Sequence, residues 1–306
     1  MSVQSADHEG STNDVHRSRD FPVLVTGATG NVGAPIVRAL LEAGIAVRGA
    51  ASSTAAVRKM FGDSVDAVEL DFTDRRTWSA AFHGVNQMFL MRPPQLSRPR
   101  KQMVPALEAA RAAGVRQMVF LSLQGAEANR IVPHAALETW LRGSGAQWTF
   151  VRPSFFMQNL STTHASDIRD RDTIVVPAGD GATAFVDADD VAAVAAAALL
   201  DPASHEYRAW TVTGSEALSY FEVASIIGET IGRTITYTKP GISTYAWHAK
   251  QVLEMPPAMI AVTTAIYTTA RLGKAGGLTD HFAAVTGHEP TTFAAFAARE
   301  HQAWER

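Results

Sequence analysis

Short apolar runs alternate with amphipathic stretches along the first half of the chain. The runs predict strands at 21–26, 45–50, 65–70, 87–90, 117–121 and 148–151. The stretches between them repeat apolar residues every three or four positions, which predicts helices at 32–43, 73–82, 101–113 and 133–142. Strands that alternate with helices at this spacing form a parallel sheet covered on both faces. We therefore expect a doubly wound α/β fold of the Rossmann type, with strand order 3-2-1-4-5-6.

The alternation loosens after residue 153. Here the pattern predicts helices at 191–200, 220–231, 245–253, 257–272 and 293–304, and strands at 210–213 and 234–238. We expect residues 21–153, joined by 185–213, to form the sheet domain. Residues 154–184 and 214–306 are expected to form a smaller, mainly helical substrate-binding lobe over the carboxyl edge of the sheet. Residues 1–20 are polar and lack any apolar period, which predicts a flexible tail.

Three glycines, Gly27, Gly30 and Gly33, stand between the first predicted strand and the first helix. The first permits a tight turn, the second lets the backbone approach a pyrophosphate, and the third lets the helix pack closely. Free N–H groups at the start of the helix attract the anion. The alternative is a purely structural turn. At this junction the pattern favours a dinucleotide site made by Gly27, Thr29, Gly30, Asn31, Val32 and Gly33, so 21–153 is the expected NAD(P)-binding domain.

The ends of the second and third strands bear on the choice of cofactor. The second carries no carboxylate to repel a 2′-phosphate, and Ser52, Ser53 and Arg58 are suited to bind one, which favours NADPH and leaves NADH open. The alternative is that the serines cap a helix and Arg58 lies on a solvated face. After the third strand, Asp71 and Phe72 are expected to border the adenine, unless Asp71 caps the next helix instead.

Composition narrows the choice of partner. A net charge of −3 and a pI near 6.4 favour neither nucleic acid nor an anionic membrane, so we expect a small-molecule substrate. The absence of cysteine excludes disulfides and thiolate chemistry, and the histidines show no metal-binding spacing. No apolar leader or long apolar run occurs, so we expect a cytoplasmic protein. The sequence leaves the oligomeric state open, a homo-oligomer included.

The chain resembles the NmrA-like, atypical branch of the short-chain dehydrogenase/reductase superfamily from about residue 21 onward. Beyond the glycine turn, the resemblance is carried by 71–74, 121–122, His134 with Glu138, 148–153, 155–159, 185–191 and 289–293. It implies binding of NADP(H) or NAD(H), with the nicotinamide over the loop at Met91, Arg92 and Pro93. Pro153 and Phe155 are then expected near its carboxamide. Family members often carry an arginine near the end of the second strand, where this chain has serines.

Ordinary short-chain dehydrogenases use a tyrosine with a lysine four residues later, and this chain has no such pair. Its tyrosines are at 207, 220, 237, 245 and 267. The helix after the fifth strand offers His134 and Glu138 instead, four residues apart on one face. Glu138 is therefore expected to orient His134 or to raise its pKa, so that His134 donates a proton; the alternative is a surface ion pair. Ser122, after the fifth strand, is expected to bind a substrate oxygen or to cap a turn.

A conjugated acceptor suits a site without the tyrosine and lysine, because the anion formed by hydride addition is delocalised and a weak donor can protonate it. Phe156, Met157, Trp247 and Met255 are expected to line a flat apolar pocket between the lobes, with core packing as the alternative. We therefore predict an NAD(P)H-dependent oxidoreductase that transfers hydride to a quinone-like or conjugated carbonyl compound. The alternative is a non-catalytic, NAD(P)-sensing regulatory protein of the NmrA type.

Overall fold

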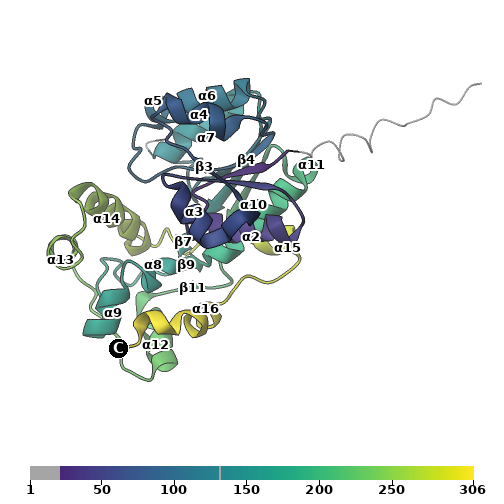
Figure 1. The fold of residues 1–306 in the computed structure, drawn as a ribbon. Coiled ribbons are helices and arrows are strands. Elements are labelled where there is room, and N and C mark those ends of the chain that lie inside the picture. The colour runs from purple at the N-terminus through teal and green to yellow at the C-terminus, as the bar shows by residue number, and fades with distance from the viewer. Residues whose placement is uncertain (1–20, 131) are drawn as a thin grey trace, which may run out of the picture. The chain divides into compact units, whose positions relative to one another are not determined.

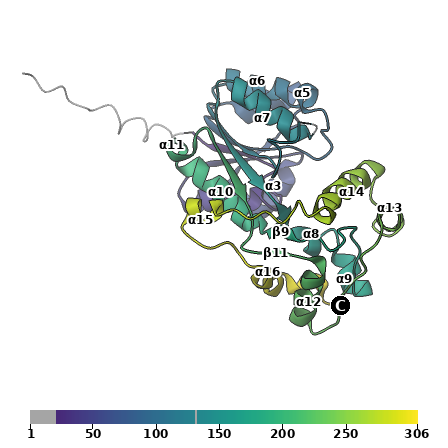
Figure 2. The same cartoon turned by 180° about the vertical axis from the view of Figure 1, so that it is seen from behind.

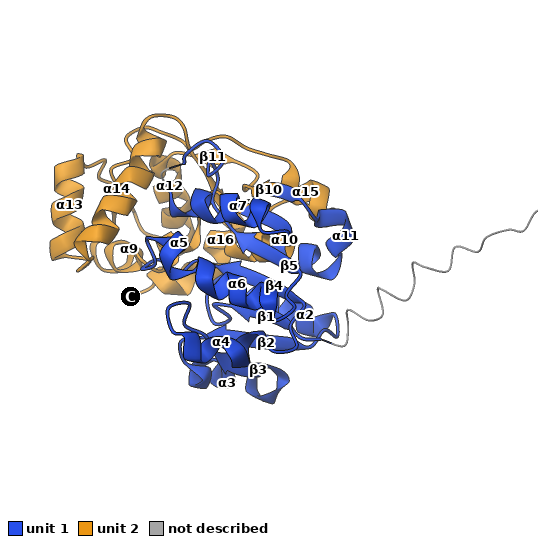
Figure 3. Ribbon diagram, turned by 90° about the horizontal axis from the view of Figure 1, so that it is seen from above, with its two compact units in different colours: residues 1–151, 195–209 blue, residues 152–194, 210–306 orange. Residues whose placement is uncertain are grey.

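The computed structural model describes residues 21–130 and 132–306, so the tail predicted at 1–20 lies outside the described residues. Two compact units share the chain, the first running to residue 151 and including 195–209, the second comprising 152–194 and 210–306 (Figure 3). Segments 185–194 and 210–213, which we expected to join the sheet domain, group with the second unit, although 210–212 form the end of strand β10 (Arg208–Val212) of the central sheet. For 185–194 the reason is that strand β9 (Thr183–Val186) pairs with short strands of the second unit.

A seven-stranded sheet forms the centre of the first unit. Its strands are β1 (Val23–Thr26), β2 (Val47–Ala51), β3 (Asp66–Glu69), β4 (Gln87–Met91), β5 (Gln117–Leu121), β6 (Gln147–Pro153) and β10 (Arg208–Val212). Their order is β10-β6-β5-β4-β1-β2-β3, and the pairs among β1 to β6 are parallel. This arrangement confirms the predicted doubly wound order and the additional strand that returns to the sheet. The carboxyl ends of β1, β2, β4 and β5 therefore lie along one edge.

Helices cover both faces of this sheet (Figures 1 and 2). One face carries α2 (Gly33–Glu42) and α3 (Thr54–Phe61), and the other carries α4 (Trp78–Phe82), α5 (Pro99–Gln102), α6 (Val104–Ala112) and α7 (Pro133–Gly143). The unit also contains the 3-10 turns Gly62–Ser64 and Arg75–Thr77 and the short helix α11 (Pro202–His205). Helix α3 was anticipated only in the alternative in which the serines cap a helix, and Val57 is its one buried residue. The helix predicted at 101–113 is two helices, since Pro105 lacks an N–H group for an intrahelical bond.

The core of the first unit lies between the strands and the second of these helix layers. Leu24, Met88, Phe120 and Phe150 of the strands pack in one buried cluster with Trp78, Phe82, Leu107, Leu137 and Leu141 of the helices. Strand β5 is buried along its whole length, as expected of a strand covered on both faces. This packing holds the strand ends in place, so side chains that follow β1, β4 and β5 have a rigid support.

The second unit is mainly helical, with two small sheets. The strands are β7 (Phe155–Phe156), β9 and β11 (Ala217–Leu218) in one sheet, and β8 (Thr173–Ile174) and β12 (Thr236–Tyr237) in the other. The helices are α8 (Gln158–Ser161), α9 (Ala165–Arg171), α12 (Tyr220–Ile231), α13 (Ile242–Gln251), α14 (Pro257–Arg271), α15 (His281–Thr286) and α16 (Phe293–Glu300), followed by the 3-10 turn His301–Trp304. Helix α10 (Ala188–Leu200) begins here and runs into the first unit. Within the described residues, each helix is too short or too polar to cross a bilayer.

Two carboxylates near the start of α10 hold the segment that contains α16. Asp190 accepts hydrogen bonds from the backbone N–H (2.7 Å) and the hydroxyl (2.9 Å) of Thr291. Asp187 pairs with Arg299 (2.8 Å) and also caps α10 by accepting from the N–H of Asp189 (3.0 Å). Residues about 100 positions apart are thereby joined within the second unit.

Candidate nucleotide and acceptor site

The turn after β1 has no room for side chains at two of its glycines. Gly27 has φ +64°, and a Cβ atom there would collide with the thioether end of Met91. A Cβ atom on Gly33 would collide with the carbonyl group of Gly27, so α2 starts directly against the turn. Gly30 donates a hydrogen bond to the Gly27 carbonyl (2.9 Å) and closes the turn. The backbone is therefore the surface that this turn presents.

The start of α2 retains unused hydrogen-bond donors. The backbone N–H groups of Asn31 and Val32 donate no hydrogen bond within residues 21–130 and 132–306, and Val32 provides no side-chain cap. Such an uncapped helix start, next to glycines without side chains, is suited to the oxygens of a pyrophosphate. The residues present therefore fit a dinucleotide, with Thr29 in the same turn.

Thr26 holds the end of β4 beside the glycine turn. Its buried hydroxyl donates a hydrogen bond to the carbonyl of Phe89 (3.0 Å) and accepts one from the N–H of Met91 (2.8 Å). These two bonds place the loop at 91–93 next to Gly27. Sequence reasoning did not single out Thr26; a threonine at the last position of the strand, directly before the glycine, was the available signal.

Ser52, Ser53 and Arg58 are exposed at the end of β2, the strand that pairs with β1. Ser53 occupies the N-cap position of α3, yet its side chain makes no capping bond. The capping alternative therefore does not hold for Ser53. The exposed hydroxyls and guanidinium leave this strand end able to bind a phosphate.

At the end of β3 the structure favours the structural alternative. Asp71 accepts hydrogen bonds from the N–H and the hydroxyl of Thr73, both at 2.7 Å, so it caps the following turn. Phe72 is buried in the core with Leu70 and Trp78. The Phe72 ring fills the core, so an adenine at this strand end, which stays a prediction, would meet the residue through its backbone.

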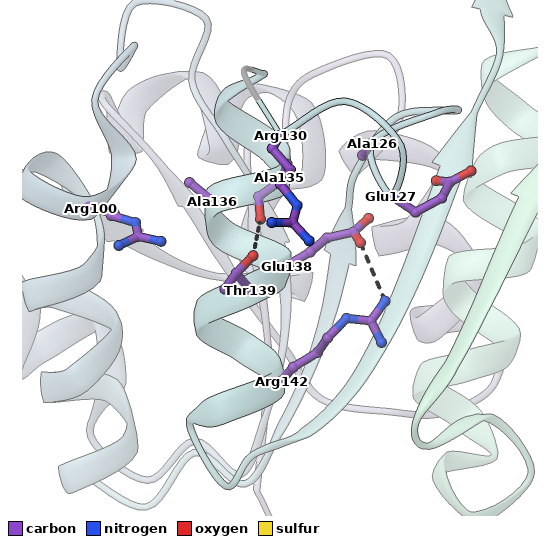
Figure 4. A pocket seen from close by; sticks show the side chains of 9 residues that line it. All are labelled: Arg100, Ala126, Glu127, Arg130, Ala135, Ala136, Glu138, Thr139 and Arg142. Atoms are coloured by element: carbon purple, nitrogen blue, oxygen red, sulfur yellow. Dashed lines mark hydrogen bonds and ion pairs between the residues drawn. The ribbon is translucent and has the colours of Figure 1, made fainter.

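Glu138 accepts a hydrogen bond from Ser122, and within the described residues it exchanges none with His134. The Ser122 hydroxyl donates to Glu138 Oε1 (2.6 Å), both side chains are only 3% exposed, and Arg142 lies 3.6 Å from Glu138 Oε2. Figure 4 shows Glu138 and Arg142 side by side along α7, in the wall of a cavity of about 750 Å³. While Ser122 donates its proton to Glu138, it can only accept a hydrogen bond from a substrate. The side chains of Ser122 and Glu138 are therefore already paired with each other before any substrate binds.

His134 is neutral at physiological pH. Burial, and secondly the positive charge of Arg92, lower its pKa from 6.5 to about 4, and the opposing effect of Glu138 is smaller. Glu138 raises this pKa, as expected, but burial and Arg92 outweigh its effect, and no ion pair between His134 and Glu138 is formed within the described residues. The ring stacks on Phe120 with 6.0 Å between the ring centroids. A neutral imidazole remains a hydrogen-bond donor.

Arg92 folds back over the loop that follows it. Its Nη1 atom donates to the carbonyls of Pro93 (2.9 Å), Pro94 (3.0 Å) and Leu96 (3.1 Å). Its Nε atom is buried and has no hydrogen-bond partner in the described part of the chain. Burial lowers the pKa of Arg92, although a guanidinium stays charged in proteins. The loop expected under the nicotinamide thus carries a fixed positive charge.

The remaining predicted residues belong to the second unit. Pro153 is buried, and Phe155 and Met255 pack against that unit's core. Met157 is 1% exposed within the same core, so it does not line a surface, and core packing is the outcome for this residue. Phe156 is half-buried. Trp247, on α13, is 64% exposed and is available to a ligand.

Comparison with known proteins decides the family. A model of the NmrA-like family matches residues 20–271. The chain belongs to the NmrA-like family. This NmrA-like protein is 35% identical over 283 residues to an NAD(P)H azoreductase of Xenophilus azovorans, an alignment that covers 90% of this chain and 96% of the relative. The predicted family is confirmed. The predicted class, an NAD(P)H-dependent oxidoreductase, agrees with relatives that are reductases and dehydrogenases by name.

Solved structures show the same fold. The NADPH-dependent quinone oxidoreductase QOR2 of Escherichia coli, in complex with NADPH, superposes with a TM-score of 0.81 at 22% identity, covering 90% of this chain and 99% of that one. The triphenylmethane reductase of Citrobacter sp., in complex with NADP(H), gives 0.79 at 21% identity, covering 92% and 99%. The Rossmann-type fold predicted for this NmrA-like protein is thereby confirmed.

Proposed function

We propose that this protein reduces a quinone-like or otherwise conjugated small molecule with NADPH, without a Tyr/Lys catalytic pair. The observation that carries the proposal is the glycine turn after β1: a Cβ atom at Gly27 or Gly33 would collide with its neighbours, and the amides of Asn31 and Val32 find no acceptor among the described residues. The relatives' names support the reaction class, since azo compounds, quinones and triphenylmethane compounds are all conjugated.

The residues of the first unit have separate tasks in this proposal. The glycine turn and the start of α2 bind the pyrophosphate, and Ser52, Ser53 and Arg58 bind the 2′-phosphate. Thr26 holds the loop at 91–93 in position. NADPH, when bound, supplies the hydride. The conjugated acceptor delocalises the negative charge that hydride addition leaves on it, so that water or the N–H of His134 suffices to supply the proton.

Two aromatic rings of the second unit are accessible to a ligand. Trp247 offers an exposed ring and Phe156 a partly exposed one, both suited to a flat aromatic compound. We assign the nicotinamide carboxamide to Pro153 and Phe155 on the resemblance alone. Asp71 contributes to this site through the turn that it caps and not through its charge.

The first experiment measures binding of NADPH and NADH to the purified protein by calorimetry. We expect NADPH to bind at least tenfold more tightly, because the end of β2 has exposed hydroxyls and a guanidinium and no carboxylate. Oxidation of NADPH is then followed with a quinone, an azo dye and a triphenylmethane dye. The Gly33→Ala variant, in which a Cβ atom collides with Gly27, serves as the control for contaminating reductases.

The outcomes separate the two functional classes. Oxidation by the wild-type protein, together with its loss in the Gly33→Ala variant, supports a reductase. Tight NADPH binding without oxidation of any acceptor contradicts the proposal and favours a nucleotide-sensing regulator. Failure to bind either NADPH or NADH would contradict both the reductase and the nucleotide-sensing regulator.

A further inference from the structure

The guanidinium of Arg92 has one edge in use and one edge unused. Nη1 is held by three loop carbonyls, whereas Nε is buried without a partner and Nη2 makes no hydrogen bond within the described residues. The Nε–Nη2 edge presents two parallel N–H groups, which match the two oxygens of a carboxylate. No Asp or Glu of the described chain forms an ion pair with Arg92. A partly buried cation therefore lacks a counter-ion.

His134 lies near the guanidinium of Arg92. Met91, which precedes Arg92, is the register partner of Leu121 in β5, and the His134 ring stacks on Phe120, the residue before Leu121. Nδ1 of His134 is buried without a partner, and Nε2 makes no hydrogen bond to any described residue. Arg92 is the neighbouring charge that lowers the pKa of His134. Two unsatisfied donors from different elements thus converge near the ends of β4 and β5.

Unsatisfied buried donors are costly, and native proteins retain few of them without a function. The neighbouring polar groups do not satisfy these two, because Ser122 donates to Glu138 and Glu138 also pairs with Arg142. The start of α7 at Pro133 adds the positive end of an 11-residue helix next to His134. An oxyanion is the ligand that would satisfy all of these groups together.

We propose that the Nε–Nη2 edge of Arg92, with the N–H of His134, binds a planar oxyanion carried by the acceptor, such as an aromatic carboxylate. This rests on the proposed function and narrows its substrate class to conjugated compounds with an acidic group. We assign the oxyanion to the acceptor and not to the cofactor because, although Met91 brings this loop close to Gly27, the groups proposed to bind the cofactor's phosphates follow β1 and β2. Arg92 and His134 follow β4 and β5.

Binding without turnover provides the test. The probes are 2-naphthoate and its neutral, isosteric partner 2-naphthamide, titrated by calorimetry into protein saturated with NADP⁺. We expect the wild-type protein to bind naphthoate at least tenfold more tightly. Arg92→Gln should reduce this preference to less than twofold. Arg116→Gln removes one positive charge before β5, at the opposite edge of the sheet, and should keep the preference.

Arg92 also holds the loop at 93–96, so its replacement could disturb the loop alone. A fall in NADP⁺ affinity or melting temperature in Arg92→Gln would reveal this, and His134→Gln then decides, because His134 bonds to no loop carbonyl. It should lower the naphthoate preference at least threefold. Equal binding of the two probes by the wild-type protein, or a preference that survives in both variants, overturns the inference. Absence of NADPH oxidation would instead refute the proposed function, since these titrations need no turnover.

Discussion

Thr26 provides the sharpest test of how the fold positions the cofactor loop. Thr26→Val keeps the shape of the side chain but removes the hydroxyl that joins β1 to Phe89 and Met91. The N–H of Met91 then loses its acceptor, and an unsatisfied buried donor costs about 1–3 kcal/mol. Loss of the bond to Phe89 adds about 1 kcal/mol. We expect the free energy of unfolding to fall by about 2–4 kcal/mol.

The variant should also bind NADPH less tightly. The loop at 91–93 packs against Gly27 through Met91, so freeing its N–H loosens the wall of the nucleotide turn. We expect the dissociation constant to rise about tenfold, which corresponds to about 1.4 kcal/mol. Urea unfolding measures the first quantity and calorimetric titration the second, both at the same pH and ionic strength.

Thr149→Val is the matched control. Thr149 is equally buried in β6 of the same sheet, and its hydroxyl donates one hydrogen bond, to the carbonyl of His205 (2.8 Å). The Thr149→Val substitution should lower the free energy of unfolding by about 1 kcal/mol and leave the NADPH affinity unchanged within twofold. If both variants weaken NADPH binding equally, the loss reflects general destabilisation, and the positioning role of Thr26 is refuted.

Three further changes test the nucleotide turn, the phosphate site and the second unit. Gly33→Ala should raise the NADPH dissociation constant at least tenfold, measured by calorimetry, because its Cβ collides with the Gly27 carbonyl. Arg58→Glu should weaken NADPH at least tenfold and NADH less than threefold in the same assay, since only NADPH carries the 2′-phosphate. Burial lowers the pKa of His164 from 6.5 to about 4. The native state therefore resists protonation, and stability falls as pH drops from 6.5 to 4, by up to about 3 kcal/mol; His164→Gln should flatten this slope in urea unfolding.

Each of these changes has a control in the chain. Gly143→Ala places a Cβ in open space and should leave NADPH binding intact; a similar loss would contradict the collision argument. Arg116→Glu reverses a charge at the opposite edge of the sheet, so equal weakening of NADPH would show that long-range charge, and not a phosphate site, is responsible. His288 is exposed, and an unchanged acid slope in both His164→Gln and His288→Gln would exclude His164 as its source.

The strand order followed from the sequence because it depends on local patterns. Each buried strand reads as an apolar run, each crossover helix carries an apolar face, and right-handed crossovers leave few ways to connect them. Strand β5 was predicted at its observed bounds, and so was α12. Short elements of the second unit, such as α8 and α9, escaped prediction because they are too brief to show a period.

The side-chain partners within the candidate site could not be predicted from the sequence, for a different reason. Glu138 was assigned to His134 because a spacing of four is visible in the sequence, whereas its bond to Ser122 spans 16 residues and depends on how α7 lies over β5. The bond between Thr26 and Met91 spans 65 residues. The direction in which Arg92 turns depends on carbonyls of its own loop. Sequence spacing identifies candidates, and packing selects among them.

The attachment of α16 to α10 has a consequence for synthesis on the ribosome. Phe293, Phe296 and Trp304 are buried in the core of the second unit, and Asp187 and Asp190 find Arg299 and Thr291 only when that segment is present. The sheet of the first unit can form once residue 212 has emerged from the ribosome, but the core of the second unit is complete only after residue 304 has emerged. During that interval its apolar residues are exposed to chaperones and proteases. Messages or nonsense mutations that stop translation before α16 should therefore yield little lasting protein, even though every residue proposed to bind the nucleotide has been made.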